Sequence, residues 1–228
     1  MKVVALLPMK ANSERVKGKN FRDFGGKPLF HWMLDTLKSV SAIDTIVINT
    51  DARYLLTENG LIEGDRVIIR DRKLEICGDY VSMNLVINDD VQNINADLYL
   101  MTHTTNPFLS KKSVEAAISQ FKIALQSRKA DSLFSVNKIQ ERFYDGDAKP
   151  INHDPNNLLR TQDLEPWYKE NSNLYLFTKE SFNRTNARIG KNPMMLEIES
   201  YESTDIDTPD DWDLAEVMIE HYKKRISK

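Results

Sequence analysis

Residues Val3 to Asn20 read VVALLPMKANSERVKGKN, a short apolar run that leads directly into a polar loop. The apolar part, Val3–Leu7, has the length and composition of a buried strand. The loop that follows carries four cations: Lys10, Arg15, Lys17 and Lys19. The whole chain has a net charge of -3, so this cluster predicts a site for an anion such as polyphosphate. The alternative is a solvated basic loop, because runs of charge are commonly just exposed.

This basic loop, residues 9–20, differs from the two common glycine-rich phosphate motifs. A P-loop requires Gly-x-x-x-x-Gly-Lys-Ser/Thr, and a dinucleotide site requires Gly-x-Gly-x-x-Gly. Neither spacing occurs in the loop. We therefore expect long cationic side chains to contact the phosphates, in place of a close approach by the backbone.

Strand and helix patterns alternate along the first half of the chain. The expected strands are Val3–Leu7, Thr45–Asn49, Val67–Ile69 and Asp97–Thr102. The expected helices are Leu29–Val40, Ala52–Asn59, Ser82–Val91 and Ser110–Ser127. This alternation predicts an α/β fold of three layers with a mostly parallel sheet. Such sheets bind ligands beyond the carboxyl ends of their strands, and the basic loop lies at one such end.

The second half of the chain has a different pattern. It contains three expected strands and a last helix: Asp131–Ile139, Asn173–Phe177, Met194–Glu199 and Pro209–Ile226. The length fits a single domain, residues 1–228. Residues 138–170 are expected to leave the core as an excursion that caps the substrate or contacts a second subunit. A long surface loop is the alternative, although such loops are uncommon in compact domains.

Two aspartates, Asp205 and Asp207, precede the last expected helix. Thr208 suits the N-cap of that helix and Pro209 its first position. Asp205 and Asp207 have no such role, and residues two apart in an extended segment point the same way. Two carboxylates on one side repel each other unless a cation lies between them, so we expect a Mg²⁺ site completed by phosphates. The alternative is an exposed acidic loop.

Composition argues against several classes of function. Apolar residues make up 41% and charged residues 29%, as in ordinary globular domains. No apolar stretch approaches the ~20 residues of a membrane span, so no membrane partner is expected. The slightly acidic balance argues against general nucleic-acid binding. A single cysteine, Cys77, and the absence of a secretion-signal pattern lead us to expect the reducing cytoplasm.

The motifs together resemble those of the acylneuraminate cytidylyltransferases, the CMP-sialic acid synthetases, which are related to the CMP-Kdo synthetases. Residues 8–20 contain Pro-x-Lys-x-x-Ser-x-Arg-x-x-x-Lys-Asn, which is similar to the N-terminal signature of that family. The later landmarks occur in the same order: Arg70, residues 100–107, residues 171–175 and residues 205–208. The resemblance covers nearly the whole chain. It implies a core like that of the nucleotide-diphospho-sugar transferases, with an inserted segment through which members commonly form homodimers.

The resemblance also implies a reaction and a set of site residues. CMP would pass from CTP to the anomeric hydroxyl of a 2-keto-3-deoxy acid sugar, with Mg²⁺ as cofactor and pyrophosphate as leaving group. The implied nucleotide contacts are Lys10, Ser13, Lys19, Asn20, Arg70, Asp79 and Ser82. The implied contacts to the acid sugar are His103, Thr104, Lys169 and Asn171. Lys19, Asp207 and Lys10 would carry catalysis, and Asp205 and Asp207 would hold the metal.

Three residues depart from the sialic-acid type of this family. Lys10 replaces the usual arginine, so the planar fork that binds phosphate through two hydrogen bonds is lost. His103 replaces a glutamine that faces the sugar, and Lys169 replaces an arginine that commonly meets it. We therefore hypothesise an acceptor other than N-acetylneuraminate, such as a legionaminic, pseudaminic or Kdo-like acid.

Two other functions remain open from the sequence. A nucleotide-sugar glycosyltransferase of similar build would carry its Asp-x-Asp near mid-chain, at the end of a central strand. Thr102, His103 and Thr104 occupy that position here, which favours nucleotidyl transfer. The third possibility is a non-catalytic module that binds nucleotide.

Overall fold

The computed structural model describes residues 1–64 and 66–226. The strands of its main sheet are β1 (Val3–Leu6), β4 (Thr45–Thr50), β5 (Val67–Asp71), β6 (Leu98–Thr102), β7 (Ser132–Ile139), β8 (Trp167–Phe177) and β9 (Pro193–Glu197). Their order is β5-β4-β1-β6-β8-β7-β9. Every pairing is parallel except those that β8 makes with β6 and β7. The predicted α/β fold with a mostly parallel sheet is confirmed.

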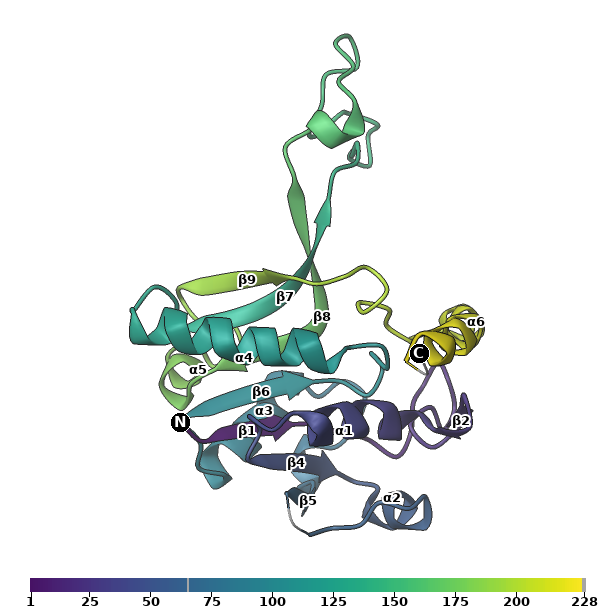
Figure 1. Cartoon of the computed structure of the whole chain (residues 1–228), viewed down its shortest axis with the longest axis vertical. Coiled ribbons are helices and arrows are strands. Elements are labelled where there is room, and N and C mark those ends of the chain that lie inside the picture. The colour runs from purple at the N-terminus through teal and green to yellow at the C-terminus, as the bar shows by residue number, and fades with distance from the viewer. Residues whose placement is uncertain (65, 227–228) are drawn as a thin grey trace.

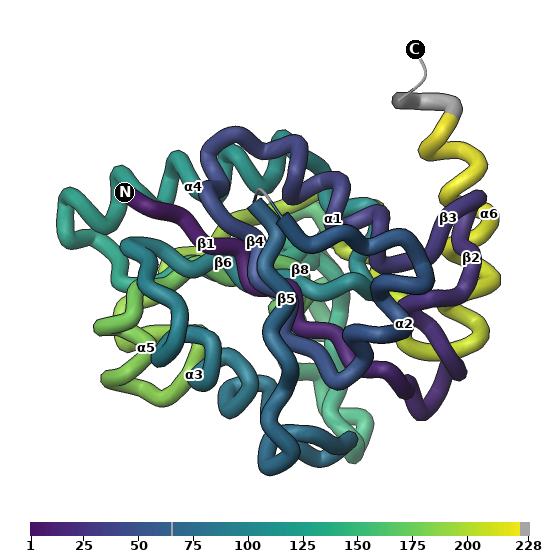
Figure 2. Tube along the Cα trace, turned by 90° about the horizontal axis from the view of Figure 1, so that it is seen from below, coloured from purple at the N-terminus to yellow at the C-terminus, as the bar shows by residue number. Residues whose placement is uncertain are grey.

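Helices cover both faces of this sheet. They are α1 (Leu29–Ser39), α2 (Arg53–Glu58), α3 (Met83–Asn93), α4 (Lys111–Gln126), α5 (Lys179–Thr185) and α6 (Pro209–Ile226). Helices α1 and α4 lie on one side of the sheet and α3 and α5 on the other (Figure 2). None of the helices within the described residues is long and apolar enough to cross a membrane.

Strand β1 shows why three layers form. Its side chains alternate between two buried clusters, because successive residues of a strand point to opposite faces. Val3 and Ala5 enter the cluster that includes residues of α1 and α4, whereas Val4 and Leu6 enter the one that includes residues of α3 and α5. All four side chains are completely buried. A strand that is apolar at every position is what a sheet covered on both faces requires.

The last helix, α6, returns the chain to the basic loop. Trp212 of α6 packs edge-on against Phe24, with ring centroids 5.5 Å apart, in a cluster that includes Val16 and Ile206. Phe24 belongs to β2 (Asp23–Phe24), which pairs with β3 (Lys27–Pro28) just before α1. The hydroxyl of Thr208 accepts a hydrogen bond from the backbone N–H of Asp211 at 3.2 Å, which confirms the predicted N-cap. This packing brings residues 205–207 alongside the start of the chain.

Strands β7 and β8 extend beyond the sheet as a two-stranded arm (Figure 1). In this arm Val136 pairs with Glu170 and Ile139 with Trp167, and residues 140–166 connect the two strands. Strand β8 begins at Trp167, six positions before the expected Asn173. Its first four residues are exposed and lack alternation, so pairing with β7 rather than a hydrophobic pattern makes them a strand.

Candidate active site

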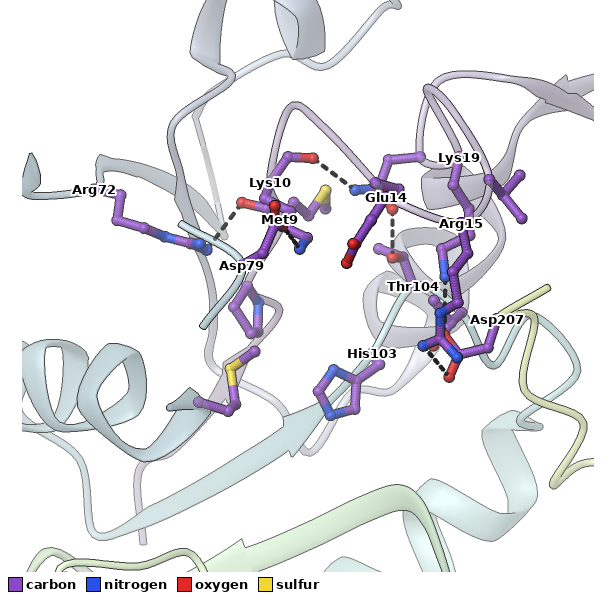
Figure 3. Close-up of a pocket in the computed structure, with 16 residues that line it drawn as sticks. Met9, Lys10, Glu14, Arg15, Lys19, Arg72, Asp79, His103, Thr104 and Asp207 are labelled. Atoms are coloured by element: carbon purple, nitrogen blue, oxygen red, sulfur yellow. Dashed lines mark hydrogen bonds and ion pairs between the residues drawn. The ribbon is translucent and has the colours of Figure 1, made fainter. Parts of the chain in front are cut away.

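A pocket lies at the carboxyl ends of β1 and β6, beneath the basic loop (Figure 3). Its lining includes residues from four separate parts of the chain: Lys10, Ser13, Arg15, Lys19, Asn20, Arg72, Asp79, His103, Thr104 and Asp207. The edge at which parallel strands end is where sheets of this kind bind ligands. The predicted location of the site is therefore where the structure forms a pocket.

Lys19 and Asp207 meet at one end of this pocket. The Lys19 ammonium donates to the carbonyl oxygen of Ile206 at 2.5 Å and to Oδ1 of Asp207 at 3.1 Å. The other oxygen of Asp207 lies 2.9 Å from Nη2 of Arg15. Lys19 is buried, whereas Arg15 is exposed. Two cations are thus paired with one carboxylate at the surface of a pocket. Such a site can bind a phosphate chain, which contacts the cations, together with a metal ion, which contacts the carboxylate.

Lys10 lies further along the pocket and is fixed by two neighbours. Its ammonium is 2.5 Å from Oδ1 of Asp79. Its carbonyl oxygen accepts a hydrogen bond from Nδ2 of Asn20 at 3.0 Å. The side-chain oxygen of Asn20 in turn accepts a 2.6 Å bond from the hydroxyl of Thr104. This network joins the basic loop to the end of β6 and places Lys10, Asn20 and Thr104 around one cavity.

His103 follows β6 and borders the same cavity (Figure 3). Burial lowers its pKa from 6.5 to about 4, and the charges of Arg188 and Lys19 act in the same direction. The imidazole is therefore neutral at physiological pH. A neutral ring offers one donor and one acceptor, which suits a hydroxyl or a carbonyl group of a ligand.

Asp205 is half-buried near Asp207, although it does not itself line the pocket. Burial is the largest cause that raises its pKa, and the charge of Asp207 raises it further. One of its carboxylate oxygens, Oδ1, is buried and has no hydrogen-bond partner among the described residues. Within that part of the chain, no group of three or more His, Cys, Asp or Glu side chains is arranged to hold a metal.

Besides Asp205, four residues predicted for the site lie outside this pocket. Arg70 is held between Asp89 and Asp90 of α3, 2.9 Å from Asp89. Ser82 is the N-cap of α3 and accepts from the N–H of Asn84 at 3.3 Å. Roles for these two at the nucleotide stay predictions that the geometry of this pocket does not favour.

The other two, Lys169 and Asn171, belong to β8. Lys169 is exposed on the arm, paired with Asn137 of β7. Asn171 is buried, accepts a 2.6 Å hydrogen bond from the hydroxyl of Ser135 and donates to Asn137 at 3.2 Å. Neither side chain lines the pocket described here. Their contact with the acid sugar also stays a prediction.

Arg72 is a pocket residue that the sequence reading missed. Its guanidinium donates from Nη2 to the carbonyl oxygens of Met9 and Asn49, at 2.9 and 2.8 Å. Burial lowers its pKa, and the charge of Asp51 opposes that effect most strongly. The available signal was a second arginine two positions after Arg70, directly after the same strand.

Comparison with known proteins shows which family the chain resembles along its length. The family described as Cytidylyltransferase matches residues 4–223. The CMP-N,N'-diacetyllegionaminic acid synthase of Legionella pneumophila is 27% identical, covering 96% of this chain and 97% of that protein. The pseudaminic acid cytidylyltransferase of Campylobacter jejuni is 24% identical, covering 96% of each.

A solved structure shares the fold. It is that of CMP-2-keto-3-deoxy-manno-octonic acid synthetase complexed with CTP. Its TM-score is 0.70 at 14% sequence identity, covering 97% of this chain and 100% of that one. The family match spans both the basic loop and the aspartates before α6, the two segments that meet in the pocket. On these grounds the chain belongs to the cytidylyltransferase family, whose members are nucleotidyltransferases.

Proposed function

We propose that the protein transfers CMP from CTP to the anomeric hydroxyl of a 2-keto-3-deoxy acid sugar of the nonulosonate type, with release of pyrophosphate. The observation that carries this proposal is the meeting of Lys19 and Asp207 in one pocket with Lys10 and Arg15. In reactions of this kind, positioning and charge neutralisation supply most of the catalysis. The site offers both, and the family match supports the choice of cytidylyl transfer.

Each cation of the pocket would contact a different part of the triphosphate. Lys19 is buried and held by a backbone carbonyl, so its ammonium is already in place when charge develops on the reacting phosphate. Lys10 and Ser13 border the same space and would contact other phosphate oxygens. Arg15 now pairs with Asp207 at the surface, and a phosphate chain would supply it with alternative anionic partners.

The residues before α6 fit a Mg²⁺ ion. Asp205 has a buried carboxylate oxygen with no hydrogen-bond partner in the described residues, and the charge of Asp207 is close enough to raise its pKa. Hard carboxylate oxygens of this kind are what Mg²⁺ binds, together with substrate phosphates. Asp205 and Asp207 would hold the ion, which neutralises phosphate charge and lowers the pKa of a bound hydroxyl. His103 borders the pocket as a neutral ring, and its pKa of about 4 makes it only a weak base for that hydroxyl.

The acceptor is proposed from the end of β6. His103 and Thr104 border the pocket at this strand end, where they can contact sugar hydroxyl groups. The two bacterial relatives are named for legionaminic and pseudaminic acids, and both match nearly the whole chain. Together with the departures at Lys10 and His103, these names favour a bacterial nonulosonate over N-acetylneuraminate.

Pyrophosphate release with CTP, Mg²⁺ and a panel of acid sugars tests this function. The panel contains legionaminic, pseudaminic, Kdo and N-acetylneuraminic acids, and the product is identified by mass spectrometry. Turnover on a nonulosonate with formation of its CMP conjugate supports the proposal. A clear preference for N-acetylneuraminate would overturn the acceptor assignment, and stabilisation by CTP without turnover on any acid would favour a non-catalytic module.

A homodimer is proposed from the arm. The side chains of Ile151, Leu158 and Leu159 are at least half exposed on the segment between β7 and β8. Trp167 and Tyr168 add partly exposed aromatic surface at the base of this segment. Exposed apolar groups on an extension that contacts little of its own core mark an interaction surface. A second copy of the chain, with the same arm, is the partner that we propose.

The cytoplasm is the compartment proposed for this reaction. The single cysteine, Cys77, is free, as in proteins of reducing compartments. Fluorescence microscopy of a tagged chain in its own cell tests this assignment, and export to the cell surface would contradict it.

A further inference from the structure

Strand β8 contains a bulge at the point where the arm meets the core. The pairing of β7 with β8 shifts its register between Phe134 and Val136, so that Ser135 lies opposite residues 171–174 of β8. Within the bulge Ser172 has a φ of 56°, a left-handed conformation that is uncommon for residues other than glycine. Bulges and unusual backbone angles occur next to active sites, where they redirect a side chain. This bulge therefore indicates a side chain whose direction matters.

Hydrogen bonds fix the backbone of Asn173 within this bulge. Its N–H donates to Oδ1 of Asn171 at 3.3 Å, and its carbonyl oxygen accepts a 2.8 Å bond from the hydroxyl of Thr102, at the end of β6. The hydroxyl of Ser135 donates to the same Asn171 oxygen at 2.6 Å and accepts from the N–H of Leu174 at 2.9 Å. The bulge is thus held on both sides of Asn173, and the direction of its side chain is set by the fold.

The side chain of Asn173 reaches the segment that leads to α6. Its Nδ2 donates to the carbonyl oxygen of Glu202 at 2.6 Å. Residues 202–207, here called the aspartate segment, run from this contact to Asp205 and Asp207. Asn173 and Glu202 are both buried, at 0% and 3% exposure. A buried hydrogen bond therefore joins the bulge to the segment that carries both aspartates.

Asn106 holds the aspartate segment in the same way from the loop after β6. Its Nδ2 donates to the carbonyl oxygen of Thr204 at 3.3 Å. The N–H of Ile206 donates to the carbonyl oxygen of Thr105, in the same loop, at 2.9 Å. Together with the contact from the bulge, these bonds hold the backbone on both sides of Asp205.

Asn106 and Asn173 share a second property, an oxygen atom without a partner. The Oδ1 of each is buried and accepts no hydrogen bond from the residues that the structure describes. A buried polar atom with no partner lowers stability. An apolar side chain of similar shape would avoid that loss, so stability alone does not explain an asparagine at either position. The Nδ2 donor does explain it, because the aspartate segment is held through that atom.

We propose that Asn173, directed by the bulge of β8, and Asn106 are positioning residues that hold Asp205 and Asp207 in place beside the basic loop. This inference rests on the function proposed above, because the two aspartates are the proposed ligands of Mg²⁺. Carboxylates that are already aligned bind an ion more tightly than carboxylates that the ion must order. In this role neither asparagine contacts the ion or the substrate.

Asn173→Leu tests the proposal, because leucine has roughly the shape of asparagine but lacks the Nδ2 donor. Calorimetric titration of CTP with and without Mg²⁺ measures how much the ion strengthens binding. We expect this gain to fall by about tenfold or more in Asn173→Leu, the scale of a lost contact to a metal ligand, and CTP alone should bind as it does to the wild type. At saturating Mg²⁺, kcat should return toward the wild-type value. Asn106→Leu should behave in the same way.

Asn192→Leu is the matched control for this experiment. Asn192 also donates from Nδ2 to a backbone carbonyl, that of Lys129 at 2.7 Å, but it lies where β9 begins, away from the aspartate segment. Its substitution should keep the full gain from Mg²⁺. An unchanged gain in Asn173→Leu, or an equal loss in Asn192→Leu, would overturn the proposal.

Hydrogen–deuterium exchange gives a readout that needs neither turnover nor metal. In Asn173→Leu, peptides that cover residues 202–208 should exchange about tenfold faster or more, while peptides from β1 and β4 keep the wild-type rate. The midpoint of thermal unfolding should stay within about 4 °C of the wild type, because an unpartnered buried oxygen is removed along with the bond. Faster exchange throughout the chain would indicate a general loss of stability and would overturn the positioning role. Unchanged exchange in residues 202–208 would overturn it as well.

Failure of the proposed function gives a different result. If the wild-type protein turns over no acid sugar and gains nothing from Mg²⁺, the proposed function and its metal site fail together. The exchange rates of the wild type and Asn173→Leu then decide alone whether the bulge holds the aspartate segment.

Discussion

The ammonium of Lys19 lies 3.1 Å from the carboxylate of Asp207, although 188 positions separate the two residues in the sequence. The contact forms because α6 packs Trp212 onto Phe24, which follows the basic loop. Asp207 comes just before α6, and Lys19 just before β2. The packing of one helix therefore sets the distance between the cations of the basic loop and the aspartates that precede α6.

Removal of either partner of this contact is expected to impair catalysis. Lys19→Ala and Asp207→Ala should each lower kcat by about 100-fold or more, the scale of losing a preorganised charge. Steady-state pyrophosphate release with CTP measures the effect. Lys17→Ala is the matched control, because Lys17 is an exposed cation of the same loop outside the pocket lining, and it should stay close to the wild-type rate. A near-normal rate in Lys19→Ala or Asp207→Ala would remove that residue from the mechanism.

Asp205 is expected to act through Mg²⁺. In the wild-type protein, Mg²⁺ should strengthen the binding of CTP, and in Asp205→Asn this gain should shrink by about tenfold or more, as for weakened metal sites. Calorimetric titration of CTP with and without Mg²⁺ measures it. Asp210→Asn, an exposed change in the first turn of α6, should keep the full gain. If Asp205→Asn binds Mg²⁺ and CTP as the wild type does, the metal is held elsewhere.

His103 is expected to remain neutral well below its ordinary range. Its pKa is lowered from 6.5 to about 4, chiefly by burial. The contribution of the neutral ring to stability is therefore complete above pH 6.5 and is lost as the pH falls toward 4. Nitrogen NMR of the histidine rings from pH 3.5 to 8 measures the titration, and the spectrum of His103→Gln assigns the signal. Titration of this ring near 6.5 would contradict the account of the pocket.

The cap of α6 is expected to support the fold. Thr208 accepts the backbone bond of Asp211, and its own hydroxyl donates to the Asp211 carboxylate at 2.7 Å. Thr208→Ala should lower the free energy of unfolding by about 1 kcal/mol, as for other lost N-caps. Chemical denaturation measures the change. Leu214→Ala, at an exposed position of the same helix, should stay within about 0.5 kcal/mol of the wild type.

The arm is expected to hold two copies together. Leu158→Glu combined with Leu159→Glu should convert a dimer to a monomer, because charged groups are costly in an apolar contact. Sedimentation equilibrium measures the mass in solution. Ile62→Glu, equally apolar and exposed but located after α2 on the core, should remain dimeric. A monomeric wild type, or a double variant that still forms dimers, would exclude the arm as the interface.

The parts of this site that could be read from the sequence are those fixed by local pattern. The apolar strand before the basic loop identifies a strand end, and two aspartates before a capped helix identify an acidic segment. Each is a short motif whose residue types indicate what it can bind: the cations an anion, and the carboxylates a cation. The family resemblance adds that the two motifs work together, and the contact between Lys19 and Asp207 agrees.

The parts that could not be read depend on contacts across the fold. Arg70 and Arg72 lie two positions apart, so nothing local decides which one reaches the pocket. Arg70 stays outside the pocket because it forms ion pairs with Asp89 and Asp90 of α3. The side chain of Asn171 likewise has a partner within the fold, because its oxygen accepts a hydrogen bond from the hydroxyl of Ser135 of β7.

Short or exposed elements were missed for a related reason. Helix α5 has only seven residues, too few to show a helical period. The first residues of β8 are exposed and carry no alternation, so only their pairing with β7 identifies them. In both cases contacts with neighbouring elements, rather than the residue pattern of the segment, give the segment its secondary structure.

A crystal structure of the protein with CTP and Mg²⁺ tests the central claim most directly. We expect the triphosphate to lie between Lys19 and Asp207, within hydrogen-bond distance of the Lys19 ammonium, with the ion on the carboxylates of Asp205 and Asp207. A triphosphate bound away from both Lys19 and Asp207 would contradict the account.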